Sequence, residues 1–502
     1  MKSGMLVNRF CEGRSVTEQR WPQCAGHAIA VRLSQQTQSS GWQNSGWQNG
    51  GGRMMKTVFT GWLTILMSLV MPTIRVSDSA RAADLFRAPD DRPQLPISVE
   101  QLKTLGINVY ESKRLKLFTD IEPEIAKTLP PLINQAYLAW EEYFGKLPPA
   151  KDESEFQING YLMKDKAKFQ QAGLLRADLP NAFHGRQVGY QFWMMDQAQD
   201  YYRRHLLLHE ATHAYMLAIP NLDVPYSYLE GMAEHFGTHQ FVGGKLQTRL
   251  VPFNRADFRG HDRLYLMRRD IQERGIQKLL DVSEWKSADF ESLAESYAWA
   301  WGSCVFLDHH PRTRDRFRKQ AKGVTELQAI DKLENVFRDD LSEIVTEWNL
   351  FAADAWEGFD FERNAIEFRE GQPLTKLQRT KIRADRGWQS CGVLVEKGHR
   401  YELNATGQFT LADKPKPWVS EADGITFRYH NSRPLGQLLS TIRPLKKEEN
   451  DDREPMLDVR PLGNSSNFEA TRSGTLYLRL NDHPGELADN RGTVTVEVRH
   501  AE

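Results

Sequence analysis

The sequence predicts an α+β domain followed by an all-β sandwich, because the residue pattern changes once along the chain. The first part alternates strand-like segments with apolar residues at helical spacing, most clearly at 202–219. From about Gln378, glycines, short turns and alternating apolar residues replace the helical pattern. We therefore expect the two domains at 98–360 and 385–502, with a linker at 361–384 between them.

The residues before the first domain predict export. Residues 54–82 combine a basic start, an apolar stretch and an A-x-A-like cleavage site, which are the features of a secretory signal peptide. We therefore expect residues 1–53 to be a gene-start artefact, with translation beginning at Met54 or Met55; the alternative is a genuine disordered leader. Residues 83–97 are expected to be a polar, proline-rich linker. The mature protein would be periplasmic, extracellular or on the cell surface, with no membrane span after signal cleavage.

Composition indicates a folded protein and excludes one class of partner. About a quarter of the residues are charged, and the formal net charge is −1. Because the charge is balanced and no basic stripe is present, nothing predicts nucleic-acid binding. Cys304 and Cys391 are the two cysteines after the signal peptide, and they fall in different predicted domains, so the sequence does not support a disulfide between them.

Two periodicities predict the elements of the α+β domain. Alternating apolar residues indicate strands, whereas apolar residues three or four positions apart indicate helices. Pro220 ends the helix at 202–219 because proline cannot continue the hydrogen-bonding pattern. The expected strands lie at 109–118 (a pair), 157–162 and 187–193, and the expected helices at 121–144, 164–171, 202–219, 226–236, 289–309 and 327–351.

The 202–219 helix carries the motif His209-Glu210-Ala211-Thr212-His213. Two histidines at i and i+4 project from one face of a helix, so both imidazoles can reach one metal ion. Glu210 is placed to take a proton from a water on that metal rather than to bind the metal. A catalytic zinc needs a third protein ligand, and Glu230, seventeen positions after His213, is the expected one.

Neighbouring residues are assigned supporting roles. Glu234 lies one turn after Glu230 and is expected to orient a zinc-bound histidine; the alternative is that Glu234 is itself the ligand. His205 lies one turn before His209 and is expected to line the cleft. Position 219 is Ile219 rather than histidine, which excludes the metzincin pattern.

These motifs resemble those of a known clan. Residues 229–234 (Leu-Glu-Gly-Met-Ala-Glu) resemble the second zinc-ligand helix of gluzincin metallopeptidases. The order of elements across about 98–355 is similar to that of an exported bacterial family of unknown function in peptidase clan MA. This resemblance implies a zincin-like metallopeptidase domain, with a peptide or protein as substrate. It also implies that an edge strand at 187–193 binds extended peptide, and that Tyr297 stabilises the oxyanion; the alternative is that Tyr297 packs its helix against the core.

The C-terminal domain carries a second resemblance. Asn481-Asp482-x-Pro484-Gly485, followed by Asp489-Asn490-x-Gly492, resembles the calcium-dependent galactophilic lectin fold of bacteria across about 385–500. This implies a Ca²⁺ site at Asp482, Asp489 and Asn490 with the carbonyls of Glu486 and Leu411; the alternative is an Asx-rich hairpin turn. Residues 420–424 lack the His and Gln that contact sugar in that family, which puts galactose binding in doubt.

Two functions remain open at this stage. The first is an exported zinc metallopeptidase that uses Glu210 as general base and a lectin-like domain for targeting to glycan or protein. The second is a catalytically inactive zinc-fold protein that recognises surface glycans through its C-terminal domain. An intact Glu210 favours the first, because a purely structural metal site needs no base at that position.

Overall fold

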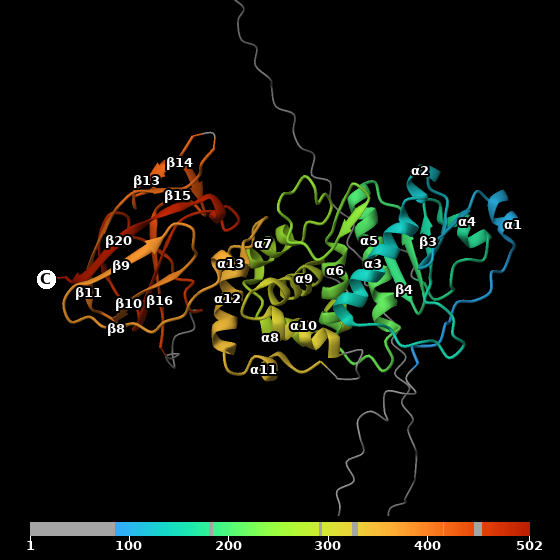
Figure 1. The fold of residues 1–502 in the computed structure, drawn as a ribbon, viewed down its shortest axis with the longest axis horizontal. Helices are drawn as coiled ribbons and strands as arrows, with labels where there is room; N and C mark the ends of the chain where they lie inside the picture. The colour runs from blue at the N-terminus through green and yellow to red at the C-terminus, as the bar shows by residue number, and fades with distance from the viewer. Residues whose placement is uncertain are drawn as a thin grey trace, which may run out of the picture.

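The computed structural model describes residues 86–179, 184–290, 294–323, 330–414, 416–445 and 454–501. The expected leader at 1–53 and signal peptide at 54–82 lie outside these residues. Figure 1 shows the described chain as a mixed α/β part followed by a β part, lying side by side along the long axis. The mixture of helices and several sheets agrees with the coarse fold class expected from the sequence.

A five-stranded mixed sheet, in the order β1-β2-β3-β5-β4, forms one end of the α/β part. Its three central strands run parallel, and the two edge strands run antiparallel to their neighbours. The strand pair expected at 109–118 is therefore present. The strands are β1 (Asn108–Glu111), β2 (Leu115–Thr119), β3 (Ile158–Met163), β4 (Gly185–Val188) and β5 (Gln191–Met195).

The segment at 187–193 is not the one strand that its alternation predicts. It folds as the end of β4, a turn at Gly189 and the start of β5. Gly189 has a φ of 57°, which a residue without a Cβ adopts at little cost. The carboxylate of Asp91 accepts the Tyr190 N–H at 2.8 Å and holds this turn. The hairpin makes β4, rather than the whole segment, the edge of the sheet.

Two of the expected helices are each divided into shorter helices in the structure. The helix expected at 121–144 is split into α2 and α3, because Pro130 and Pro131 have no N–H and lie in the first turn of α3. Within the segment expected as a helix at 327–351, the described residues form the short α11 and then α12. The α/β part also contains α1 (Val99–Thr104), α2 (Pro123–Ala126), α3 (Leu129–Phe144), α4 (Lys166–Gln171), α5 (Asp200–Leu217), α6 (Tyr226–Gly237), β6 (Gln240–Val242), β7 (Lys245–Gln247), α7 (Arg263–Arg274), α8 (Leu279–Ser283), η2 (Ser287–Phe290), α9 (Ala294–His309), α10 (Arg314–Gly323), α11 (Leu333–Val336), α12 (Leu341–Ala353) and α13 (Phe361–Asn364).

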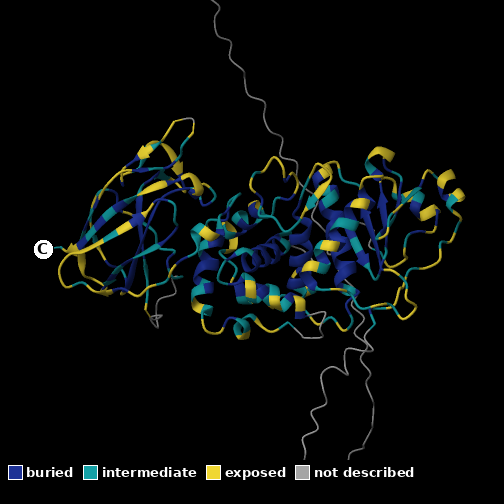
Figure 2. Ribbon diagram, in the orientation of Figure 1, coloured by how far each residue is buried: buried dark blue, intermediate teal, exposed yellow. Residues whose placement is uncertain are grey.

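Helix α6 packs on α9, which is buried along almost its whole length (Figure 2). Gly231 makes this contact close: a Cβ there would lie 2.5 Å from the Ala300 carbonyl oxygen and 2.7 Å from Cys304 Sγ. These separations are too short for any side chain, so the glycine next to Glu230 sets the distance between the two helices. Cys304 and Cys391 are both buried and free.

The segment before α1 has neither helix nor strand, as expected of a linker, but it is tied to the domain. The Arg87 N–H donates to the Pro149 carbonyl at 3.1 Å, and the Ala88 N–H donates to the Ala218 carbonyl at 3.1 Å. These backbone hydrogen bonds hold the described part of 83–97 against the fold.

The β part consists of two facing sheets with a shared apolar core. One sheet has the order β17-β16-β19-β10-β8, and the other has the order β13-β12-β20-β11-β18, with β9 paired to β20. β9 lies in the segment expected as a linker at 361–384, so the sheet begins before the expected boundary at 385. The strands are β8 (Gln372–Pro373), β9 (Gln378–Arg383), β10 (Gln389–Val395), β11 (Arg400–Thr406), β12 (Phe409–Thr410), β13 (Val419–Ser420), β14 (Ile425–His430), β15 (Arg433–Leu435), β16 (Leu438–Arg443), β17 (Arg460–Pro461), β18 (Ser465–Glu469), β19 (Gly474–Leu480) and β20 (Arg491–His500), with the short helix η4 (Leu487–Asp489) before β20.

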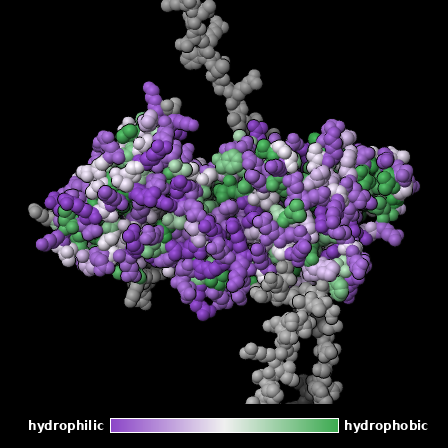
Figure 3. Space-filling model, in the orientation of Figure 1, coloured by the Kyte–Doolittle hydropathy of each residue, from purple (hydrophilic) through white to green (hydrophobic). Residues whose placement is uncertain are grey.

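Hydrophilic residues cover most of the face that Figure 3 shows. Within the ranges that the structure describes, no helix is both long enough and apolar enough to cross a bilayer.

Asp308 joins four segments of the α/β part through one buried carboxylate. Its oxygens accept hydrogen bonds from His235 and Arg249 at 3.0 Å, from Arg318 at 2.7 Å and from the Tyr143 hydroxyl at 3.0 Å. Burial alone would raise the pKa of Asp308, but the hydrogen bonds and charges of His235, Arg318 and Arg249 outweigh burial and hold it well below its usual range.

We predict that Asp308→Asn lowers the free energy of unfolding by about 2–3 kcal/mol, because a neutral amide replaces the buried carboxylate that His235, Arg249 and Arg318 share. Urea denaturation measures this change, and Asp315→Asn, at a carboxylate that is 94% exposed, should change stability by less than about 0.5 kcal/mol. Since the folded-state pKa is depressed, the contribution is present at neutral pH and is lost as the pH falls below about 4. Equal stability of the two variants would contradict this role.

Candidate metal centre

Helix α5 brings His209 and His213 together. Asp200 lies in its first turn, where a negative charge is favourable, and the helix continues to Leu217. Both histidines are buried, at 7% and 2% exposure, and their Nε2 atoms are 3.1 Å apart. The i, i+4 spacing therefore has the consequence that the sequence predicts: two imidazole nitrogens point to the same place.

Helix α6 adds Glu230 to this pair. Glu230 Oε2 lies 3.2 Å from His213 Nε2 and 3.5 Å from His209 Nε2. Ligands at about 2.0–2.2 Å from a tetrahedral zinc are about 3.4 Å from one another, so these separations suit a common ion. The two nitrogens and one carboxylate oxygen also match the donor set of catalytic zinc sites, which have three protein ligands.

Glu234 lies behind His209 rather than among the three ligand atoms. Its Oε1 is 3.4 Å from His209 Nδ1, the ring nitrogen that faces away from His213 and Glu230. Arg263 donates two hydrogen bonds to Glu234, at 2.6 and 2.9 Å, and His205 Nε2 lies 3.1 Å from the same carboxylate. This arrangement favours the orienting role expected for Glu234 over the ligand role.

Two further groups of acidic and histidine side chains lie nearby, but each already has other partners. The first group is His205, Glu234 and His261. Its carboxylate is bonded to Arg263, and His261 Nε2 lies 2.8 Å from the Thr238 hydroxyl. The second group is His235, Asp308 and His309, and its carboxylate already accepts hydrogen bonds from Arg249 and Arg318. Among the described residues, the group at His209, His213 and Glu230 is therefore the one with ligand atoms available to an ion.

Glu210 is buried beside this group, and the edge strand leaves room for it. A Cβ on Gly185, the first residue of β4, would lie 2.1 Å from Glu210 Oε1. Burial raises the pKa of Glu210 to about 8, although the charge of His209 lowers it. Sequence reasoning missed Gly185, because its closeness to Glu210 depends on how the sheet packs against α5.

The ligand groups have strongly coupled charges. Burial lowers the pKa of His209, but hydrogen bonds with Glu230 and Glu234 outweigh burial and raise it to about 10. Burial raises the pKa of Glu230, but the charge of His213 and hydrogen bonds with both histidines hold it well below its usual range. Glu230 is therefore a carboxylate, the form in which it binds metals.

Two tyrosines lie near the acidic residues. The pKa of Tyr297 on α9 is raised by burial and then by the charge of Glu230, which places the phenol in the field of the site. Its ring also packs edge-on against Phe290 at 5.1 Å, so the structure gives it the packing role as well. Tyr226, which the sequence analysis did not single out, is the first residue of α6; its pKa is raised by burial, by the charge of Glu230 and by a hydrogen bond with that carboxylate.

In the β part, the structure brings together two of the three side chains expected to bind calcium. Asn490 donates to Asp482 Oδ2 at 2.8 Å, and both side chains are buried. Burial raises the pKa of Asp482 to about 6. Asp489 is exposed at the end of η4, Glu486 is exposed, and Leu411 is buried with its N–H bonded to the Trp418 carbonyl. The calcium site stays a prediction.

No family model matches the chain, and no curated protein matches it. Among solved structures, the N-terminal domain of EclA, described as a PllA-like lectin, is similar over 26% of this chain and 98% of its own, with 20% identity and a TM-score of 0.19. A structure titled as showing that Bacillus endospore appendages form a novel family of disulfide-linked pili is similar over 27% of this chain and 93% of its own, with 7% identity and a TM-score of 0.11.

We predict that Glu230→Gln abolishes zinc binding, whereas Glu234→Gln keeps one site and weakens its affinity about 10- to 100-fold. The first variant removes a ligand oxygen, and the second removes the carboxylate that orients His209. Competition with a chromophoric chelator measures both affinities, and His399→Ala, at a half-exposed histidine outside the cluster, is the control. If Glu234→Gln removed the site and Glu230→Gln retained it, the two roles would be exchanged.

Proposed function

We propose that the protein is an exported zinc-dependent metallopeptidase that hydrolyses peptide bonds. The observation that carries this proposal is the convergence of His209, His213 and Glu230, with their ligand atoms 3.1–3.5 Å apart. The presence of Glu210 beside them supports a catalytic rather than a structural ion, because four-ligand structural sites need no adjacent base.

The side chains of the site have distinct roles in this proposal. His209, His213 and Glu230 would hold the zinc, which would act when bound as a Lewis acid that makes water reactive at neutral pH. The charge of a bound cation would favour the ionised form of Glu210, and the carboxylate then accepts the proton of the attacking water and passes it to the departing amine. Tyr297, with Tyr226 as a second phenol in the same field, donates a hydrogen bond to the oxygen that becomes negative.

The position of β4 supports an extended peptide as the substrate. β4 is the terminal strand of its sheet in the described residues, so one side of its backbone has no strand partner there and could pair with a further strand. Gly185 at its start lies against Glu210. A peptide added along β4 would therefore pass beside the general base. The sequence analysis expects a peptide-binding edge strand at 187–193, and the proposal assigns that role to β4 instead.

The β part completes the proposal as an accessory domain. We propose that it targets the peptidase to a glycan or a protein, with Asp482 and Asn490 contributing to a Ca²⁺ site together with Asp489. The buried hydrogen bond between Asp482 and Asn490 supports this proposal, because it holds the two side chains close together. The sugar-contacting residues of the resembled lectins are absent from 420–424, so the proposal does not name galactose.

We predict that Glu210→Gln retains zinc and loses peptide cleavage by a factor on the order of 10²–10⁴. The amide keeps the shape of the side chain but cannot accept the proton. Zinc content and cleavage of an unbiased peptide library are measured on the same preparations, with Glu124→Gln, at an 82% exposed carboxylate, as the control.

Zinc in both proteins with no cleavage by the unchanged chain would contradict the peptidase and favour the zinc-fold binding protein. A failure of the unchanged chain to bind zinc would contradict the metal centre itself.

We also predict that Gly185→Ala lowers turnover while zinc content is unchanged. The added Cβ would lie 2.1 Å from Glu210 Oε1, so the carboxylate must move, and a displacement of about 1 Å costs on the order of 100-fold in rate. Turnover, zinc content and thermal unfolding are measured together. Normal turnover in a stable Gly185→Ala protein would show that Glu210 does not act from its observed position.

A further inference from the structure

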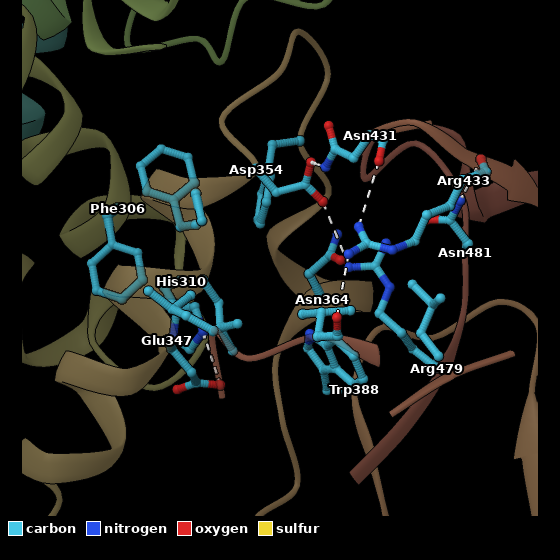
Figure 4. Close-up of a pocket in the computed structure, with 17 residues that line it drawn as sticks. Phe306, His310, Glu347, Asp354, Asn364, Trp388, Asn431, Arg433, Arg479 and Asn481 are labelled. Carbon is cyan, nitrogen blue, oxygen red and sulfur yellow. Dashed lines mark hydrogen bonds and ion pairs between the residues drawn. The ribbon is translucent and has the colours of Figure 1, made fainter. Parts of the chain in front are cut away.

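A cavity of about 120 Å³ lies between the α/β part and the β part (Figure 4). One wall comes from α9, α12 and the segment that follows α12, and the other comes from β15, β16, β19 and nearby loops. The zinc ligands do not line it. Figure 4 shows Arg479 and Trp388 on one side of this space, with Phe306 and His310 across from them.

Arg479 on β19 is a buried cation with too few partners. It is 7% exposed, and its guanidinium has five N–H donors. Nη2 donates to the Asp482 carbonyl at 2.9 Å, Nη1 is 3.5 Å from Asp354 Oδ2, and Nε is buried without a hydrogen-bond partner. A guanidinium has two N–H donors on each Nη, and these two contacts leave one donor of Nη1 and one of Nη2 for which a ligand could supply an acceptor.

The two carboxylates of the cavity have several partners besides Arg479. Glu347 accepts Arg312 Nε at 2.9 Å and the Ile366 N–H at 2.7 Å. Asp354 Oδ1 accepts His430 Nε2 at 2.8 Å and Asn431 Nδ2 at 3.0 Å. The acidic groups are therefore largely satisfied, Asp354 in part by Arg479 itself, whereas Arg479 keeps unused donors on Nη1 and Nη2.

Arg433 adds a second incompletely paired guanidinium to the same cavity. It reaches the carbonyls of Asn431 and Val459 at 3.5 and 3.3 Å, and no carboxylate of a described residue lies within ion-pair distance of it. Arg433 is partly exposed, and both guanidinium groups have unused N–H donors. An anionic ligand would fit them, because arginine binds carboxylates and phosphates through paired N–H donors.

The remaining walls of the cavity are apolar and suit the apolar part of a small organic ligand. Phe306, Phe351, Leu439 and Trp388 supply apolar surface, and the Trp388 ring centroid is 5.6 Å from the Arg479 guanidinium carbon. A cavity of about 150 Å³ accommodates a benzene ring, so the present cavity approaches that size. A compact ligand with one anionic group and an apolar face therefore matches both the size and the lining.

We propose that this cavity binds a small organic anion, whose carboxylate or phosphate oxygens are held by Arg479 and Arg433. Because the lining comes from both parts of the chain, the bound anion would also stabilise their contact. The proposal goes beyond the peptidase function and does not depend on it, since binding here requires neither zinc nor Glu210.

Calorimetric titration of the purified protein with benzoate, benzamide and inorganic phosphate tests the proposal. Benzoate and benzamide have similar shapes, but benzoate alone carries the charge. We expect saturable binding of benzoate or of phosphate, a rise in the thermal unfolding midpoint with ligand concentration, and no comparable binding of benzamide. Binding of benzoate alone would assign a carboxylate with an apolar body, and binding of phosphate alone would assign a phosphate.

Substitutions locate the binding. Arg479→Gln should abolish it, and Arg433→Gln should weaken it about 10-fold or more. Arg428→Gln, at an exposed arginine of β14 outside the cavity, is the matched control. If Arg479→Gln does not fold, Arg433→Gln decides the question. Equal binding of benzamide, no saturable binding of either anion, or full affinity in Arg433→Gln would overturn the proposal.

Discussion

The carboxylate of Glu234 holds the candidate metal centre in place. It lies 3.1 Å from His205 Nε2 and 3.4 Å from His209 Nδ1, and Arg263 clamps both of its oxygens. A buried carboxylate is stable only when such partners compensate its lost hydration, so the cluster resists rearrangement. Because Glu230 and Glu234 are one turn apart on α6, the packing of this helix on α5 fixes both carboxylates relative to His209 and His213.

Glycines create the space in which that packing occurs. Gly231 brings α6 close to the Ala300 carbonyl of α9, and Gly237 brings the same helix close to α5, where a Cβ would lie 2.9 Å from the His205 ring. Gly185 likewise leaves room for the Glu210 carboxylate beside β4. The acidic site is thus surrounded by three positions where any side chain would displace a helix or a functional group.

The sequence alone predicts which site residues lie close together when they belong to the same helix. Helical spacing places His209 with His213, and Glu230 with Glu234, without knowledge of the tertiary fold. Arg263 lies 29 positions after Glu234, and its role follows only from how the segment before α7 returns to α6. The hairpin at Gly189 was likewise missed, since strand alternation at 187–193 does not reveal where the chain reverses.

The loop at 481–490 is one of the contacts between the β part and the α/β part. The Pro484 carbonyl accepts the Asp360 N–H at 3.1 Å and the Asn364 amide at 2.9 Å, and a Cβ on Gly485 would lie 2.6 Å from the Gly358 carbonyl oxygen. One side of the loop is therefore covered by the α/β part. Glu486 and Asp489 of the same loop are exposed. Because the Asp482 carbonyl also accepts Arg479, any rearrangement of this loop changes both the contact between the two parts and the cavity that they share.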